Sequence, residues 1–266
     1  MMSEISGVDL AASELSYLLA TLDASEIVGF DAKALFPQKQ SSRKTMFSQG
    51  REELEAHGWM KPIADHPDEY ELDAELLELV SVIAAPSFVI ATRRISGEQE
   101  RQVVLHYLAD ESIVELSAVD KGTYRIGVVA DRSALFERIA AMLQLSGKAP
   151  SNHLEVNGEV FEHFQSLAQK GQLEQAKAHL ESAGIAGKMA DSVLNAVCDP
   201  AHGQIVLIRN HFGEVEAGRR VRVYGEGKRA WFVRQTSPDA ADVEMITSDA
   251  ASLKNLLTIL LDELND

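Results

Sequence analysis

The chain has 266 residues, of which 45% are hydrophobic and 25% charged, and its formal net charge is −16. This composition is ordinary for a folded globular protein, and the length allows one large domain or two modest ones. The acidic balance disfavours nucleic acid and anionic membrane surfaces as partners, because both would repel the chain. Another protein is therefore the favoured partner.

A single cysteine, Cys198, excludes an internal disulfide bond, as expected in a reducing compartment. The N-terminal residues lack the basic cluster and apolar core of a signal peptide. No apolar run approaches the roughly 20 residues that a transmembrane helix needs. We therefore predict a cytoplasmic protein.

Three helices are predicted before the first strand. The earliest places leucines between Leu10 and Leu22 on one helical face, with Asp9 or Ser13 as its N-cap. A second helix is predicted over 43–57. A third, over 74–84, begins after Asp73 and ends before Pro86.

Hairpin strands and one closing helix are predicted next. Strands rich in β-branched residues begin at Phe88, Val103, Ser112 and Tyr124, separated by polar turns, and the helix follows Asp131. Antiparallel hairpins with a helix packed on one face are the simplest arrangement for this pattern.

The second half repeats this order after a Gly-, Pro- and Ser-containing linker at 146–152. Predicted helices end near Gly171, near Gly184 and before Pro200; strands follow at 204–210, 219–224, 229–235 and 242–247, and a helix follows Asp249. The predicted fold class is α+β. It has two pseudo-symmetric halves, residues 1–147 and 148–266, each with helices, an antiparallel β-meander and a closing helix.

No catalytic, cofactor or metal motif is present. The stretch 224–228 resembles the end of a phosphate-binding loop, but it lacks the earlier glycine and the following Ser or Thr. The histidines show no ligand spacing that completes a metal site. We predict a protein that is not an enzyme and takes no cofactor. An enzyme or small-molecule sensor with a pocket between the halves is an alternative.

A winged-helix regulator is a second alternative, because a helix, short strand and helix follow one another in the first half. A recognition helix needs Lys and Arg to contact phosphates. Residues 51–80 instead carry ten acidic side chains and two basic ones, Arg51 and Lys61.

Arginines and aromatic residues gather on the second meander, and this combination is enriched at protein interfaces. Because Trp231 and Phe232 are adjacent in a strand, they should point to opposite faces, which predicts one exposed anchor. The candidate protein-binding residues are Phe212, Arg220, Arg222, Tyr224, Trp231 and Phe232.

A resemblance to a known family rests on the leucine-rich first helix, the Leu54–Gly58 segment, the helix ended by Pro86, the hairpin strands and the helix after Asp131. On these features, the chain resembles the EspG-like family of ESX (type VII) secretion systems. The resemblance covers nearly the whole chain. It implies a central sheet flanked by two helical bundles. It also implies a non-catalytic cytosolic chaperone that holds a helical PE–PPE secretion substrate. No residue of this chain is assigned a binding role from the family, because no residue motif is shared. The sequence does not predict an oligomeric state.

Overall fold

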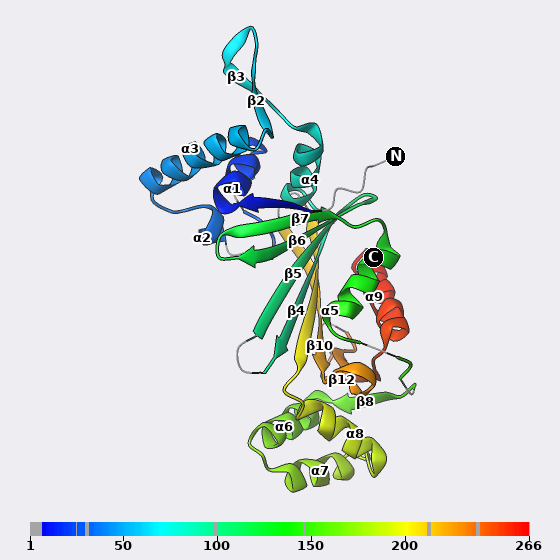
Figure 1. The fold of residues 1–266 in the computed structure, drawn as a ribbon. Coiled ribbons are helices and arrows are strands. Elements are labelled where there is room, and N and C mark those ends of the chain that lie inside the picture. Colours follow the sequence, from blue (N-terminus) through cyan, green and yellow to red (C-terminus); the bar gives the residue numbers. More distant parts are fainter. Residues whose placement is uncertain are drawn as a thin grey trace. The chain divides into compact units, whose positions relative to one another are not determined.

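The protein is described by a computed structural model, which covers residues 7–24, 26–29, 32–97, 100–145, 147–149, 151–211, 214–237 and 240–265. These residues form an α+β fold with a large antiparallel sheet, as predicted (Figure 1). Within these ranges, no helix combines the length and the apolar character needed to cross a membrane.

The predicted helices and strands occur in the predicted order, and the structure adds short strands and one short helix that were not predicted. The first half contains β1 (Val8–Ala11), α1 (Ala12–Thr21), α2 (Ala32–Leu35), α3 (Gln40–Ala56), β2 (Met60–Ile63), β3 (His66–Leu72), α4 (Ala74–Ala84), β4 (Phe88–Ser96), β5 (Glu100–Ala109), β6 (Ser112–Asp120), β7 (Thr123–Val128) and α5 (Arg132–Met142). The second half contains β8 (His153–Asn157), α6 (Gly158–Gln169), α7 (Leu173–Ser182), α8 (Lys188–Val197), β9 (His202–His211), β10 (Glu214–Tyr224), the 3₁₀ turn η1 (Gly227–Arg229), β11 (Trp231–Gln235), β12 (Asp242–Thr247) and α9 (Ala250–Asn265).

The strand order of the main sheet is β1-β7-β6-β5-β4-β9-β10-β11-β12-β8, while β2 and β3 pair separately. Both halves contribute their strands to the sheet in the same spatial order. The strand that precedes the helices, β1 or β8, lies at an edge, and the meander strands follow inward from last to first. The pseudo-symmetry of the halves in space stays a prediction.

The chain packs as two compact units, and each unit takes segments from both halves. The first unit comprises Met1–Ile90, Val104–Arg132 and Ile208–Ala217. The second unit comprises Ala91–Val103, Ser133–Leu207 and Gly218–Asp266. Strands β4, β5, β9 and β10 therefore run through both units.

In the first unit, α1 packs against α3 and α4. The predicted N-caps of the first helix, Asp9 and Ser13, are wrong. Asp9 lies in β1 and forms an ion pair with Arg125 at 2.7 Å, and Ser13 lies inside α1. The cap is supplied from within the helix instead, because the Glu14 carboxylate accepts the Ala11 N–H at 2.7 Å. This carboxylate is buried and also lies 2.8 Å from Nδ1 of His57.

In the second unit, helices cover both faces of the sheet. One face carries a hydrophobic cluster that strands share with α6, α7 and α8. On the other face, α9 presents Glu263 to the sheet, where it binds Arg219 of β10 and Arg234 of β11. The two faces therefore differ in chemistry, because one helix contact is apolar and the other includes ion pairs.

Asp249 directly precedes α9, the closing helix of the second half, and its carboxylate caps this helix. Its carboxylate accepts the N–H of Ser252 at 2.8 Å and the N–H of Ala149 at 3.1 Å, which confirms the predicted cap. Burial acts to raise the pKa of Asp249, but these hydrogen bonds together lower the pKa below its ordinary value of 3.8. The ionised carboxylate is thus favoured in the folded state.

We expect Asp249→Ala to lower the free energy of unfolding by about 1 kcal/mol at neutral pH, because the cap is lost. Since the folded pKa is lowered, the wild-type carboxylate contributes fully above the unfolded pKa of 3.8. The contribution disappears as the pH falls through the lower, folded value. The difference between wild type and variant in urea titrations should therefore shrink in strong acid. Asp249→Asn is the control, because asparagine caps helices without titrating. A difference that stayed constant down to the lowest pH would contradict this account.

Candidate functional site

Three of the candidate residues lie on one side of β10. Arg220, Arg222 and Tyr224 alternate along the strand and therefore share a face. Tyr224 pairs with Trp231, which belongs to the cluster of α6, α7 and α8. The candidate arginines thus point to the α6–α8 face. Tyr224 is covered there, whereas both arginines are exposed.

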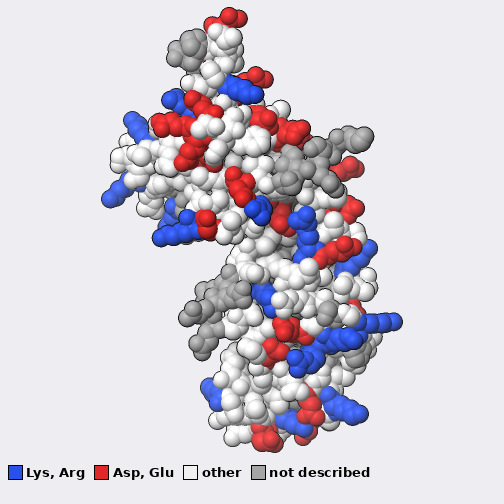
Figure 2. All heavy atoms as spheres, in the orientation of Figure 1, with Lys and Arg blue, Asp and Glu red and all other residues white. Residues whose placement is uncertain are grey.

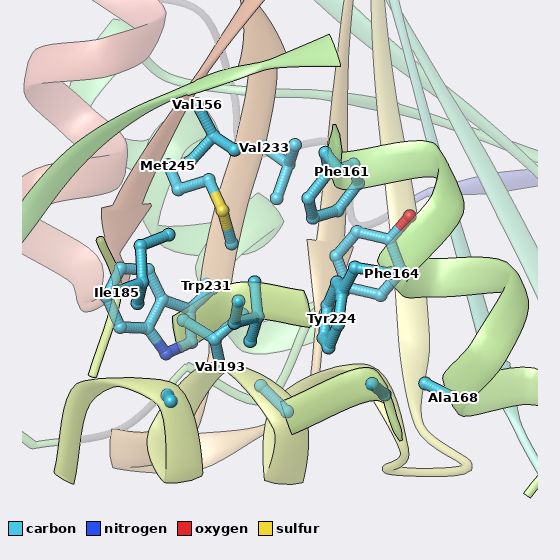
Figure 3. Packing of buried hydrophobic residues seen from close by; sticks show 14 residues of the cluster. Val156, Phe161, Phe164, Ala168, Ile185, Val193, Tyr224, Trp231, Val233 and Met245 are labelled. Atoms are coloured by element: carbon cyan, nitrogen blue, oxygen red, sulfur yellow. The ribbon is translucent and has the colours of Figure 1, made fainter. Parts of the chain in front are cut away.

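Trp231 is fully buried, at 0% exposure, and its indole Nε1–H donates to Ser192 Oγ of α8 at 3.2 Å. Figure 3 shows the indole pointing from β11 toward α8, among the side chains of Val193 and Ile185. Tyr224 packs its ring edge-on against Phe161, with 6.0 Å between the ring centroids. These two aromatic residues hold the helices on the sheet.

Phe232 points to the opposite face of β11 and is also buried, at 1% exposure. It shares that face with Arg234, whose Nη1 donates to Glu263 Oε1 of α9 at 3.2 Å. The predicted exposed anchor is therefore wrong for both Trp231 and Phe232. Alternation was predicted correctly, but helices cover both faces of this strand. Phe212, the remaining aromatic candidate, lies outside the described residues.

A hollow of about 450 Å³ opens beside Tyr224, on the α6–α8 face. Arg93 of β4 and Arg222 of β10 both line it, so the sheet brings together two arginines that are 129 positions apart in the chain. The other lining residues are Ile95, Gln165, Gln169, Val197, Asp199, Pro200, His202, Gly203, Gln204, Val223 and Tyr224. This cavity lies within the second unit.

A second hollow, of about 710 Å³, continues from Arg222 along the same strand. It lies where the pairing of β10 with β11 ends, at Arg222 and Val233. Arg220 lines it from the sheet, and Glu159 and Glu162 line it from α6. Arg222 therefore joins the two hollows. We call the surface formed by the exposed Arg220 and Arg222 and the partly buried Arg93 the arginine row.

The arginine row differs from the other arginines of the second unit in its pairing. Outside the row, Arg94 binds Glu226 at 3.1 Å, Arg219 binds Glu263 at 3.4 Å and Arg234 binds Glu244 at 2.6 Å. Within the described ranges, no ion pair or side-chain hydrogen bond engages Arg93, Arg220 or Arg222. Their donors are available to a bound molecule.

The charges on the helices of the first unit bear on the winged-helix alternative. Figure 2 shows Lys and Arg as well as Asp and Glu over α1 and α3, and α3 carries three residues of each sign: Arg43, Lys44 and Arg51, and Glu52, Glu53 and Glu55. Helix α4 carries Glu75 and Glu78 and no basic residue. Helix α4 therefore lacks the cationic surface that a phosphate backbone requires. Among the described residues, no group of three or more His, Cys, Asp and Glu side chains could hold a metal ion.

Sequence reasoning missed Arg93 as a partner of Arg222. The available signal was the repeat itself, since β4 and β9 are the first strands of the two meanders. In each meander the first strand lies innermost and the later strands lie progressively further out, so β4 and β9 are neighbours at the centre of the sheet. Exposed guanidinium groups on a sheet, beside the amides of Gln165 and Gln169, can bind the carboxylates of a protein surface.

Comparisons with known proteins show the fold. The chain is similar to the type VII secretion system chaperone EspG5 of Mycobacterium tuberculosis, whose structure was solved in complex with the PE25–PPE41 dimer. The two share 12% sequence identity with a TM-score of 0.71, over 97% of this chain and 96% of that one. The chain thus has an EspG-like fold, as the resemblance implied. No family model and no curated protein matches the sequence.

Proposed function

We propose that the protein is a non-catalytic, cytoplasmic chaperone that binds a PE–PPE-type secretion substrate of a type VII system. The observation that carries this proposal is the likeness of the fold over 97% of the chain to a chaperone solved with such a dimer bound. Fold alone does not fix function, so the surface must also suit a protein partner.

The arginine row supplies that second support. Arg220 and Arg222 are exposed, and the row lines two hollows and leaves its side-chain donors unpaired within the described residues. Arginine is among the residues enriched in protein interfaces. The buried candidates Tyr224, Trp231 and Phe232 support this surface from below, because they fix the strands and helices that position it. We propose Arg220 and Arg222 as contact residues and assign the buried aromatics a structural role.

Association with a PE–PPE dimer tests the proposal directly. The protein is co-expressed with a PE–PPE dimer, purified through a tag on the dimer and analysed by size-exclusion chromatography with light scattering. We expect one peak whose mass is the sum of the components. Failure of the folded wild-type protein to associate with several PE–PPE dimers at low salt would refute the proposed function.

Arg222→Glu should weaken this association by about 10-fold or more, because it places a negative charge where the partner meets an unpaired guanidinium. Biolayer interferometry measures the dissociation constant, and circular dichroism checks that the variant is folded. Lys254→Glu is the matched control. Lys254 is exposed on α9, so this variant makes the same change in net charge away from the row. Equal loss of affinity in both variants would show a general charge effect and contradict a role for the row.

A further inference from the structure

The hollow beside Tyr224 holds two arginines without an acidic partner, although the chain as a whole carries 41 acidic and 25 basic residues. We propose that this hollow receives an acidic side chain of the bound protein, whose carboxylate is held between Arg93 and Arg222. The inference rests on the proposed function, because it specifies the chemistry of a partner bound at the same surface.

The geometry places the two guanidinium groups on a rigid support. Arg93 and Arg222 come from β4 and β10, which lie on either side of β9 in the sheet. Because all three are sheet strands, the separation of the two arginine backbones is fixed by backbone pairing. Both residues line one cavity of about 450 Å³, together with Gln165 and Gln169 of α6. A ligand between the strands would meet charged and amide donors together.

The one carboxylate inside the hollow is already engaged. Asp199 Oδ1 accepts the N–H of Ala201 at 2.9 Å, and Asp199 Oδ2 lies 3.9 Å from Arg229. Its side chain is 15% exposed. Within the described part of the chain, no ion pair or side-chain hydrogen bond joins Arg93 or Arg222 to it or to another residue. The positive charge of the pair is therefore not cancelled locally.

A carboxylate is the group that this lining fits. Guanidinium groups bind carboxylates through parallel N–H donors, and glutamine amides add further donors. Ile95, Val197 and Val223 supply apolar lining, against which the methylene groups of a glutamate stem can pack. The adjacent hollow suits a carboxylate less well, because Glu159 and Glu162 line it.

The continuity of the surface favours a protein as the source of the carboxylate. Arg222 lines both hollows, so the two adjoin along β10, and a molecule seated beside Arg93 lies next to the hollow lined by Arg220. A small dicarboxylate would occupy one hollow only. A segment of a protein partner can place one acidic side chain in the first hollow and extend over the second.

The probe is a blocked helical peptide of alanine with three glutamates, titrated into the ¹⁵N-labelled full-length protein. The Nε–Hε resonances of Arg93 and Arg222 are assigned from single Arg→Gln variants. We expect these two resonances to shift with the glutamate peptide and to stay in place with the peptide of the same sequence in which glutamine replaces glutamate.

The double variant Arg93→Gln/Arg222→Gln should weaken binding of the glutamate peptide roughly 10- to 100-fold, as expected for lost charged hydrogen bonds. Lys121→Gln/Lys254→Gln, which removes two exposed charges elsewhere, should retain the wild-type affinity.

Three results would overturn the inference. The first is the absence of any shift at millimolar glutamate peptide. The second is an equal shift with the glutamine peptide. The third is glutarate binding as tightly as the peptide, which would identify a small carboxylate as the ligand. If a PE–PPE dimer binds the wild type and the double arginine variant equally well, this inference fails while the proposed function stands. If the dimer does not bind but the peptide does, the proposed function fails and the carboxylate site stands.

Discussion

Replacing Trp231 by alanine is expected to lower the free energy of unfolding by about 3–5 kcal/mol, the range for large aromatic residues in a core. The side chain is fully buried in the cluster that joins β11 to α6, α7 and α8. Truncation removes its contacts with Val193 of α8 and with Met245 of β12, and it leaves a cavity that rigid neighbours fill only in part. The same change unpairs the Ser192 hydroxyl, since the indole N–H donates to it at 3.2 Å.

Equilibrium urea denaturation, followed by far-ultraviolet circular dichroism, measures this loss. Ser192→Ala is the control for the hydrogen bond alone and should cost about 1 kcal/mol. Trp231→Phe should cost less than the alanine variant, because an aromatic ring still fills part of the space. A stability within about 0.5 kcal/mol of wild type, the usual effect of a surface substitution, would contradict the burial of Trp231 and restore it as an exposed anchor.

Local signals in the sequence predicted the elements that are long or clearly capped. The third helix was predicted over 74–84, and α4 spans Ala74–Ala84, with the Asp73 side chain accepting the Leu76 N–H at 3.0 Å. The cap residue, the apolar period and the proline that follows all lie within one stretch of chain, so they can be read together. The helix after Asp249 was predicted from its first residue and its apolar period, without a following proline.

The edge strands could not be predicted in this way. β1 has four residues and β8 has five, which is too short for a two-residue alternation to stand out. In the structure Val156 lies in β8 and pairs with Val243 of β12, 87 positions away. Such pairing is a long-range property that no local pattern shows.

The candidate site was predicted in part for a related reason. Strand alternation correctly placed Trp231 and Phe232 on opposite faces, but it does not tell whether a helix covers each face. Covering depends on how α6 to α8 and α9 pack, which is decided by contacts between distant segments. Arg220 and Arg222 were named as candidates on the second meander and are exposed in the structure, whereas Arg93 joined them only through the neighbouring positions of β4 and β9 in the sheet.

Gly50→Ala should also destabilise the protein, although glycine is a poor helix former. Alanine gains roughly 1 kcal/mol over glycine inside a helix, and Gly50 lies within α3. An added Cβ would, however, overlap the backbone carbonyl of Ser13 in α1 and lie 2.6 Å from its carbon atom. The obstructing atoms are backbone, so no side-chain rotation relieves the overlap, and α1 and α3 must separate. Their separation exposes buried leucines, such as Leu54, and disturbs the bond between Ser13 and Glu53.

Overpacking of this kind costs about 1–3 kcal/mol or more, so the clash should outweigh the gain in helix propensity. The expected result in urea denaturation is a net loss of roughly 1–2 kcal/mol. Ser42→Ala is the matched control, because Ser42 is exposed on the same helix and the substitution changes propensity without a clash. That control should be neutral or slightly stabilising. If Gly50→Ala were stabilising to a similar degree, propensity alone would govern the position, and the close approach of α1 to α3 would be wrong.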